Sequence, residues 1–211
     1  MRKWFGLLAL LAAGVFTAVV YSDLPERLPT HWNMAGEADA WSSRRGGALM
    51  LPLAGLAIWA LLQWLPRIDP LRQNYEKFRP TYDVAINFIL VFMAAAHVFV
   101  LGAALGWPLD TRRALPIGIG VMCIVIGNVL PRARRNWFFG VRTPWTLSSD
   151  RVWERTHRTA GYLFAALGAA LLVATALPLS LPANAVFVSI GVVAAITVLY
   201  SYVAWRQESA R

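Results

Sequence analysis

The chain has 211 residues, of which 58% are hydrophobic and 15% are charged, and its mean hydropathy is +0.51. This composition is too apolar for an ordinary soluble domain and predicts a membrane protein. The formal net charge of +9 does not indicate nucleic-acid binding, because the basic residues lie in connections between apolar segments, where they meet anionic lipid.

Six apolar segments follow one another along the chain, at residues 4–21, 47–65, 84–105, 114–130, 160–177 and 183–204. Each is close to the roughly 20 residues that a helix needs to cross the hydrocarbon core. The sequence therefore predicts an all-α polytopic membrane protein with six transmembrane helices. In chain order we expect an N-terminal membrane region at 1–66, a middle region with the third span at 67–113, and a C-terminal region at 114–211.

The orientation follows from the basic residues. If the N-terminus lies inside, 15 of the 20 arginines and lysines fall on the inner side and 5 on the outer side. Cytoplasmic loops carry the excess of positive charge in membrane proteins. We therefore expect both termini to be cytoplasmic, the first connection to lie outside, and the connection after the fourth span to lie inside.

The first outer connection reads DLPERLPTHWNMAGEADAWSSRRGG. Pro25 and Pro29 oppose helix formation, so His31 and Asn33 are expected two apart in an extended stretch, and Gly36 permits a turn after them. This arrangement predicts a polar cluster at the membrane surface.

Two interpretations of this loop stay open. His31, Glu37 and Asp39 are residue types that bind a metal or an extracellular peptide, but their spacing is not specific for a metal, and we predict no metal site. The alternative is an ordered interfacial loop, in which Trp32 and Trp41 belong to the aromatic belt.

His97 is the one clearly ionisable residue in the core of a predicted span. Such a residue is a functional candidate because burying its charge is costly, while the alternative is a neutral imidazole hydrogen-bonded to a neighbouring helix. None of the eleven acidic residues lies at the centre of a predicted span. This pattern argues against a proton-coupled transporter or an intramembrane aspartyl protease.

The inner connection begins with a basic cluster suited to lipid phosphates, at Arg132, Arg134 and Arg135. Turn formers and aromatic residues follow and predict a compact loop. Ser149 is expected to cap the next helix, with Asp150 in its first turn. A hydrolase that uses His157, Asp150 and a serine at 148 or 149 is disfavoured, because seven residues of helix separate the first two by about 10 Å.

Two motifs carry a family resemblance. The run GNVLPRARRNWFFGVRTPWTLSSDRVWERTHRTAGYLF resembles the signature of the SdpI family, which comprises bacterial multispanning membrane proteins. The outer stretch LPTHWNMAGEADAW is similar to the motif of a small domain of unknown function at the N-terminus of the same proteins. The resemblance implies a non-enzymatic protein of the bacterial plasma membrane. It would confer immunity to a secreted antimicrobial peptide toxin and relay the toxin's presence to a cytoplasmic transcriptional repressor.

The resemblance also implies site residues. In the outer loop, peptide recognition would involve His31, Asn33, Gly36 and Trp41. In the inner segment, the output surface would involve Asn136, Gly140, Arg142, Thr143, Pro144, Trp145, Trp153 and His157. The expected partners are the lipid bilayer, the toxin and the repressor, with no cofactor and no direct contact with nucleic acid. A small-solute transporter or a structural membrane subunit is the alternative that the sequence leaves open.

Overall fold

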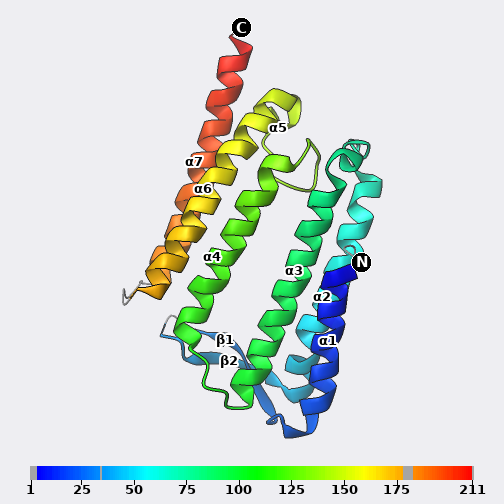
Figure 1. Cartoon of the computed structure of the whole chain (residues 1–211), viewed down its shortest axis with the longest axis vertical. Coiled ribbons are helices and arrows are strands. Elements are labelled where there is room, and N and C mark those ends of the chain that lie inside the picture. Colours follow the sequence, from blue (N-terminus) through cyan, green and yellow to red (C-terminus); the bar gives the residue numbers. More distant parts are fainter. Residues whose placement is uncertain (1–3, 34, 178–182, 211) are drawn as a thin grey trace. The chain divides into compact units, whose positions relative to one another are not determined.

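Helices dominate the computed structural model of the chain, which describes residues 4–33, 35–177 and 183–210 (Figure 1). Within these residues, six helices are long and apolar enough to cross a membrane. They are α1 (Phe5–Val20), α2 (Arg44–Ile68), α3 (Asn74–Ala104), α4 (Thr111–Val129), α6 (Asp150–Ala176) and α7 (Ala183–Ser209). The predicted all-α fold with six spans is confirmed.

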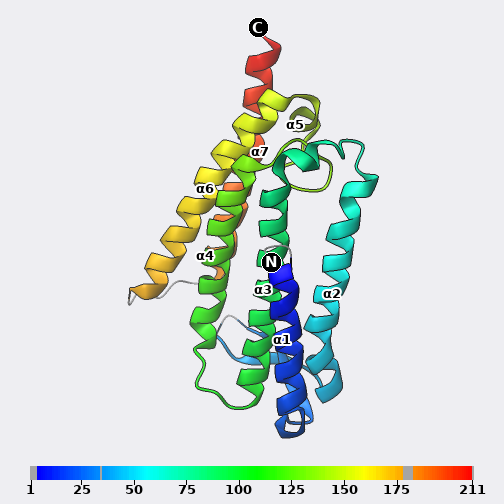
Figure 2. The ribbon, with the colours of Figure 1, turned by 45° about the vertical axis from the view of Figure 1, so that its right-hand side comes forward.

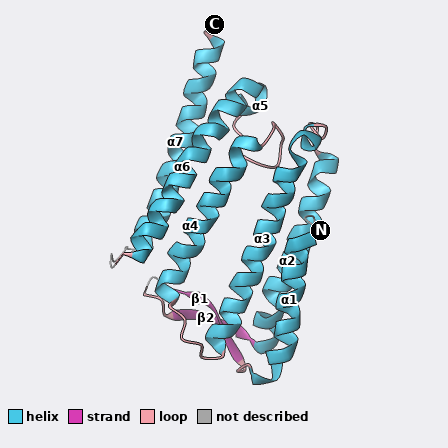
Figure 3. Ribbon diagram, viewed as in Figure 1, coloured by secondary structure: helices cyan, strands magenta, loops and turns pink. Residues whose placement is uncertain are grey.

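Shorter elements fill the connections. The first connection holds the antiparallel strands β1 (Arg27–Trp32) and β2 (Ala38–Ser43), which Figure 3 distinguishes from the helices by colour. Helix α5 (Pro144–Ser148) is a single short turn, and two 3₁₀ turns, η2 (Tyr21–Asp23) and η3 (Leu130–Arg132), follow α1 and α4. The expected extended stretch near His31 is thus one strand of a hairpin.

Helix α3 begins ten residues before the predicted span and includes Pro80. A proline inside a helix lacks its N–H and clashes with the carbonyl of the residue four positions earlier. The chain relieves this conflict at Phe78, where φ is −131° and ψ is 20°, so that two helical stretches meet at a kink. Pro80 therefore bends the helix rather than preventing it.

The chain forms two compact units, each assembled from two stretches. The first consists of Met1–Gln63 and Ile86–Leu115, and the second of Trp64–Ala85 and Pro116–Arg211. In the first unit, a buried cluster of Leu24, Leu28, Ala48 and Leu101 connects the hairpin to the helices. The hairpin is therefore held by a hydrophobic core and is not a free loop.

In the second unit, α6 and α7 lie side by side, as Figures 1 and 2 both show. Small residues let α4 approach α6 closely: Gly127 meets Gly161, and Gly120 meets Gly168. Close backbone approach through small residues is how membrane helices gain packing energy where lipid offers no hydrophobic driving force. Helix α6 has 27 residues, or about 40 Å at 1.5 Å per residue, so it is longer than the roughly 30 Å hydrocarbon core.

Candidate functional site

The tip of the β1–β2 hairpin is organised by Asn33. Its side-chain Oδ1 accepts backbone N–H groups from Ala35 at 2.9 Å and from Glu37 at 3.0 Å. The backbone N–H of Gly36 donates to the Asn33 carbonyl at 2.9 Å, and Gly36 has a φ of +77°. A positive φ favours glycine because it has no Cβ, so the expected turn at Gly36 is present and Asn33 holds it closed.

This tip is docked on the start of α4, within the same unit. The Thr111 hydroxyl donates to the carbonyl of Gly36 at 2.7 Å, and the Arg112 Nε donates to the carbonyl of Ala35 at 2.7 Å. A Cβ on Gly36 would lie 2.6 Å from Cγ of Arg112. Position 36 therefore requires a residue without a side chain, both because of its positive φ and because of this contact with Arg112.

His31 and Asp39 form a polar pair on the hairpin, with Nδ1 and Oδ1 2.6 Å apart. Their side chains are 69% and 43% exposed, and Trp41 is 52% exposed. Trp32 instead packs edge-on against Phe99, with ring centroids 5.5 Å apart. Among the described residues, no group of three His, Cys, Asp or Glu side chains is placed to hold a metal ion. The exposed surface of the hairpin thus includes a polar pair and a tryptophan.

The connection between η3 and α5, residues 133–143, is the inner loop. Its Asn136 is fully buried, and the side chain of this residue bonds to the loop backbone on both sides. Its Oδ1 accepts the backbone N–H groups of Phe138 at 3.0 Å and Phe139 at 2.6 Å. Its Nδ2 donates to the carbonyls of Arg134 at 2.8 Å and Phe139 at 2.9 Å. A buried amide must find such partners, so Asn136 serves as an internal scaffold of the loop.

Asp69, which the sequence analysis did not single out, anchors this loop to the turn before α3. Its side chain is 2% exposed and accepts bonds from the Leu71 N–H at 2.7 Å, the Tyr75 hydroxyl at 3.0 Å and the Trp137 N–H at 2.8 Å. A buried carboxylate is tolerated only with such partners. In the sequence, the pair Asp69-Pro70 could have indicated a turn at this position, because aspartate followed by proline is typical of a type I turn.

His157 is also fully buried, and both of its ring nitrogens are engaged. Nε2 accepts the backbone N–H of Val141 at 2.9 Å, and Nδ1 lies 2.8 Å from the carbonyl of Trp153. Since a carbonyl only accepts, Nδ1 carries the proton and the imidazole is neutral. No nitrogen is left to activate a serine, and the Asp150 carboxylate pairs with Arg135 at 2.8 Å.

Trp153 and Gly140 complete the surroundings of this histidine. The Trp153 ring stacks on His157 with centroids 4.0 Å apart, and its Nε1 donates to the carbonyl of Ala133 at 2.9 Å. Gly140 has a φ of +110°, and a Cβ there would lie 2.3 Å from Nε2 of His157. The loop therefore passes directly over the imidazole at a residue without a side chain.

The rest of the segment docks on α6 and α7. Thr143 and Thr146 form a capping box that starts α5, and Ser149 caps α6 by accepting the Val152 N–H at 3.3 Å, as expected. Pro144 is the first residue of α5, where its missing N–H costs nothing. Other contacts reach α7 and the loop surface: Trp145 Nε1 donates to the Ser201 hydroxyl, and the exposed Arg142 donates to the carbonyl of Trp137.

His97 lies fully buried in α3, where its Nε2 is 2.7 Å from the Thr17 hydroxyl of α1. That hydroxyl donates its single proton to the carbonyl of Ala13 at 2.8 Å. Nε2 is therefore the donor of the bond to Thr17, and Nδ1 has no partner. The histidine joins two helices of the first unit.

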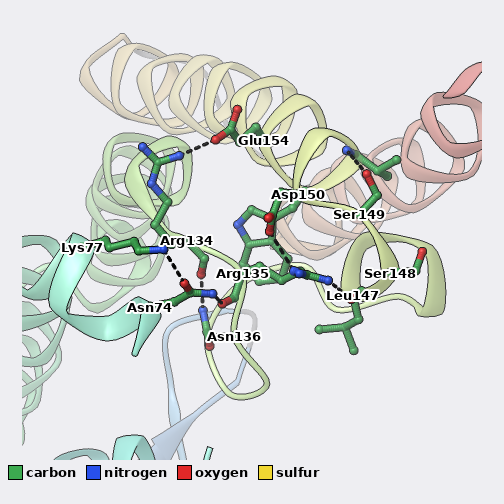
Figure 4. Close-up of polar contacts among 12 residues, drawn as sticks. Asn74, Lys77, Arg134, Arg135, Asn136, Leu147, Ser148, Ser149, Asp150 and Glu154 are labelled. Carbon is green, nitrogen blue, oxygen red and sulfur yellow. Dashed lines mark hydrogen bonds and ion pairs between the residues drawn. The ribbon is translucent and has the colours of Figure 1, made fainter. Parts of the chain in front are cut away.

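A cavity of about 300 Å³ opens beside the inner loop. Its charged walls form two ion pairs, Arg134 with Glu154, and Arg135 with Asp150 (Figure 4). Its lining consists of Asn74, Lys77, Arg134, Arg135, Asp150, Trp153 and Glu154.

The fold and the two sites define a multi-pass α-helical membrane protein. The connection after α1 forms an ordered hairpin, and the connection after α4 contains a network of buried, hydrogen-bonded polar side chains. Residues 132–201 match the model of the SdpI/YfhL protein family, and residues 7–56 match that of the domain of unknown function DUF1648. Over 169 residues the chain is 25% identical to the immunity protein SdpI of Bacillus subtilis (strain 168), covering 80% of this chain and 79% of that protein. No solved structure matches the chain. The chain is an SdpI-family protein, and the predicted family is confirmed.

Proposed function

We propose that this chain is a non-enzymatic protein of the bacterial plasma membrane that protects its cell from a secreted peptide toxin. The observation that carries the proposal is the likeness to an immunity protein over 80% of the chain. Separate family matches include the hairpin and the inner loop. We also propose that both termini are cytoplasmic, because 15 of 20 basic residues then lie inside.

In this proposal the hairpin contacts the toxin from outside the cell. His31, Asp39 and Trp41 offer a polar pair and an aromatic ring on one exposed surface. A few residues, most often tryptophan, tyrosine and arginine, supply most of the binding energy at protein interfaces, so Trp41 is the expected anchor. Asn33 and Gly36 act indirectly, since they hold the turn on which the exposed residues are mounted.

On the cytoplasmic side, the exposed surface of the inner loop would contact the repressor. Arg142 is exposed, and Trp137 has half of its side chain in solvent. Arginine and tryptophan are the residue types that most often dominate protein interfaces. The buried Asn136 and His157 would support this surface without touching the partner.

Expression in a toxin-sensitive strain tests the proposal. Cells that express the wild-type chain should survive the cognate peptide, and Trp41→Ala should lose most of that protection at an unchanged membrane level. Trp64→Ala is the matched control, because Trp64 is 49% exposed and lies at the other end of α2 from the hairpin. Unchanged killing of cells that contain normal amounts of wild-type protein would sink the proposal.

A further inference from the structure

The cavity beside the inner loop has no part in the proposed function. Its lining comes from three segments of the second unit: the first turns of α3, residues 134 and 135 of the loop, and the first turns of α6. Figure 4 shows the charged side chains of these segments gathered around one space. The cavity therefore has to be explained by its own chemistry.

Its charges do not cancel. The lining has three cations and two carboxylates, and each carboxylate is already paired with an arginine. The remaining cation is Lys77, whose Nζ donates to the Asn74 side-chain oxygen at 3.0 Å. An ammonium group has three N–H donors, so this single bond to a neutral amide leaves Lys77 able to bind an anion. The side chains that line the cavity have a formal excess of one positive charge.

The two ion pairs differ in how firmly they are held. Arg135 is held by the loop itself, because its side chain is only 24% exposed and its Nη1 donates to the Leu147 carbonyl at 2.8 Å, although its ion-pair partner Asp150 is 71% exposed. Arg134 and Glu154 are 50% and 58% exposed, and an exposed pair of this kind contributes little stability. Arg134 can therefore turn from Glu154 toward an anion in the cavity at small cost.

We propose that this cavity binds a phosphate group that carries one negative charge. Lysine and arginine are the side chains that proteins use for phosphate, the first as a point charge and the second as a fork of donors. The volume of about 300 Å³ is roughly ten times that of one water molecule, which leaves room for a phosphate and an ester substituent. The formal excess of one positive charge in the lining matches the single negative charge of a phosphodiester.

Two sources supply such a group, a phospholipid headgroup and a soluble phosphate. Trp153 lies seven residues before residue 160, where the predicted span begins, or about 10 Å along the helix. This distance places the cavity close to the layer of headgroups, which extends about 5–8 Å beyond the hydrocarbon core on each side. Both sources therefore reach the cavity and are tested separately.

The experiment uses the full chain in an uncharged detergent, with two probes. For the first probe, phosphatidylglycerol is added to the protein, and native mass spectrometry counts the lipid molecules that stay bound. For the second probe, inorganic phosphate is titrated by calorimetry, with sodium acetate as the comparison anion. We expect Lys77→Gln to weaken phosphate binding about tenfold, because it removes one charge within a few ångström of the anion. Glu154→Gln removes a carboxylate and releases Arg134, so it should strengthen binding by a similar factor.

Arg151→Gln is the matched control, since Arg151 is an exposed arginine of α6 that does not line the cavity. It removes one positive charge from the same region and should leave binding within twofold of the wild type. Retention of the lipid alone assigns the cavity to a headgroup, and binding of inorganic phosphate alone assigns it to a soluble phosphate. Absence of both, equal binding of acetate, or equal effects of the Lys77 and Arg151 variants would overturn the proposal.

Discussion

Replacing Gly140 by alanine should damage the inner loop while leaving the helices around it intact. The φ of +110° at Gly140 is unfavourable for any residue with a Cβ, and that Cβ would lie 2.3 Å from Nε2 of His157. The loop must therefore shift, and its shift breaks the 2.9 Å bond from the Val141 N–H to the same nitrogen.

The magnitude follows from these two effects. A residue held in a sparsely populated backbone region costs about 1–3 kcal/mol. Leaving a buried donor and acceptor without partners costs about 1–3 kcal/mol. Because partial relaxation relieves some of both, we expect a loss of about 2–4 kcal/mol in the free energy of unfolding. At about 2–4 °C per kcal/mol for a chain of this size, the melting temperature should fall by roughly 4–16 °C.

Thermal unfolding of the purified protein in detergent measures this loss. Limited trypsin digestion gives a local measurement, because Arg142 is exposed and lies two residues from the substitution. Gly191→Ala is the matched control: Gly191 lies inside α7, and a Cβ there meets nothing within 4 Å. A Gly140→Ala variant that melts within 1 °C of wild type, with unchanged cleavage after Arg142, would refute this account of the loop.

Three further predictions concern other contacts. Asp69→Asn places an amide NH₂ against groups that also donate, so thermal unfolding should show a loss of about 1–3 kcal/mol, and an unchanged midpoint would contradict the buried network. Thr17→Val removes the only hydrogen-bond partner of His97 in the described structure and should cost about as much, whereas Thr17→Ser should melt near the wild type. A membrane-impermeant maleimide should label the Glu37→Cys variant in intact cells, and the Arg151→Cys variant only after lysis. The native cysteine, Cys123, is buried and should not react. The reverse labelling pattern would overturn the proposed orientation.

Local patterns were sufficient to predict the spans and several of their ends. Each span is an apolar run of nearly the length that a bilayer requires, and Ser149 could be identified as a cap because a hydroxyl before a helix satisfies a free N–H. The start of α3 was missed by ten residues, since Pro80 indicates a helix end. The kink at Phe78 accommodates it, and single-sequence patterns do not distinguish a bend from a stop.

Pairings between distant segments could not be predicted. Asp69 bonds the Trp137 N–H across 68 positions of sequence, and Thr111 bonds the hairpin tip across 75. Spacing along a chain reports which side chains share a helix face, but it contains nothing about which loop meets which turn. Asp69 was therefore visible only as a turn residue, and its role as a buried anchor emerges from the fold.

The inner motif that first indicates the family is mostly architecture. Asn136, Gly140 and His157 make the segment conspicuous in the sequence. Yet the side chains of Asn136 and His157 are buried and bonded to the loop backbone, and Gly140 is the point where the loop passes over the imidazole. A residue that is fully buried and has all its donors and acceptors satisfied has nothing left to offer a partner. The contact with a repressor that we propose would therefore fall to exposed groups such as Arg142. Substitutions at the buried positions should abolish function through the loss of the loop, whereas substitutions at the exposed positions should alter binding in a protein that remains folded.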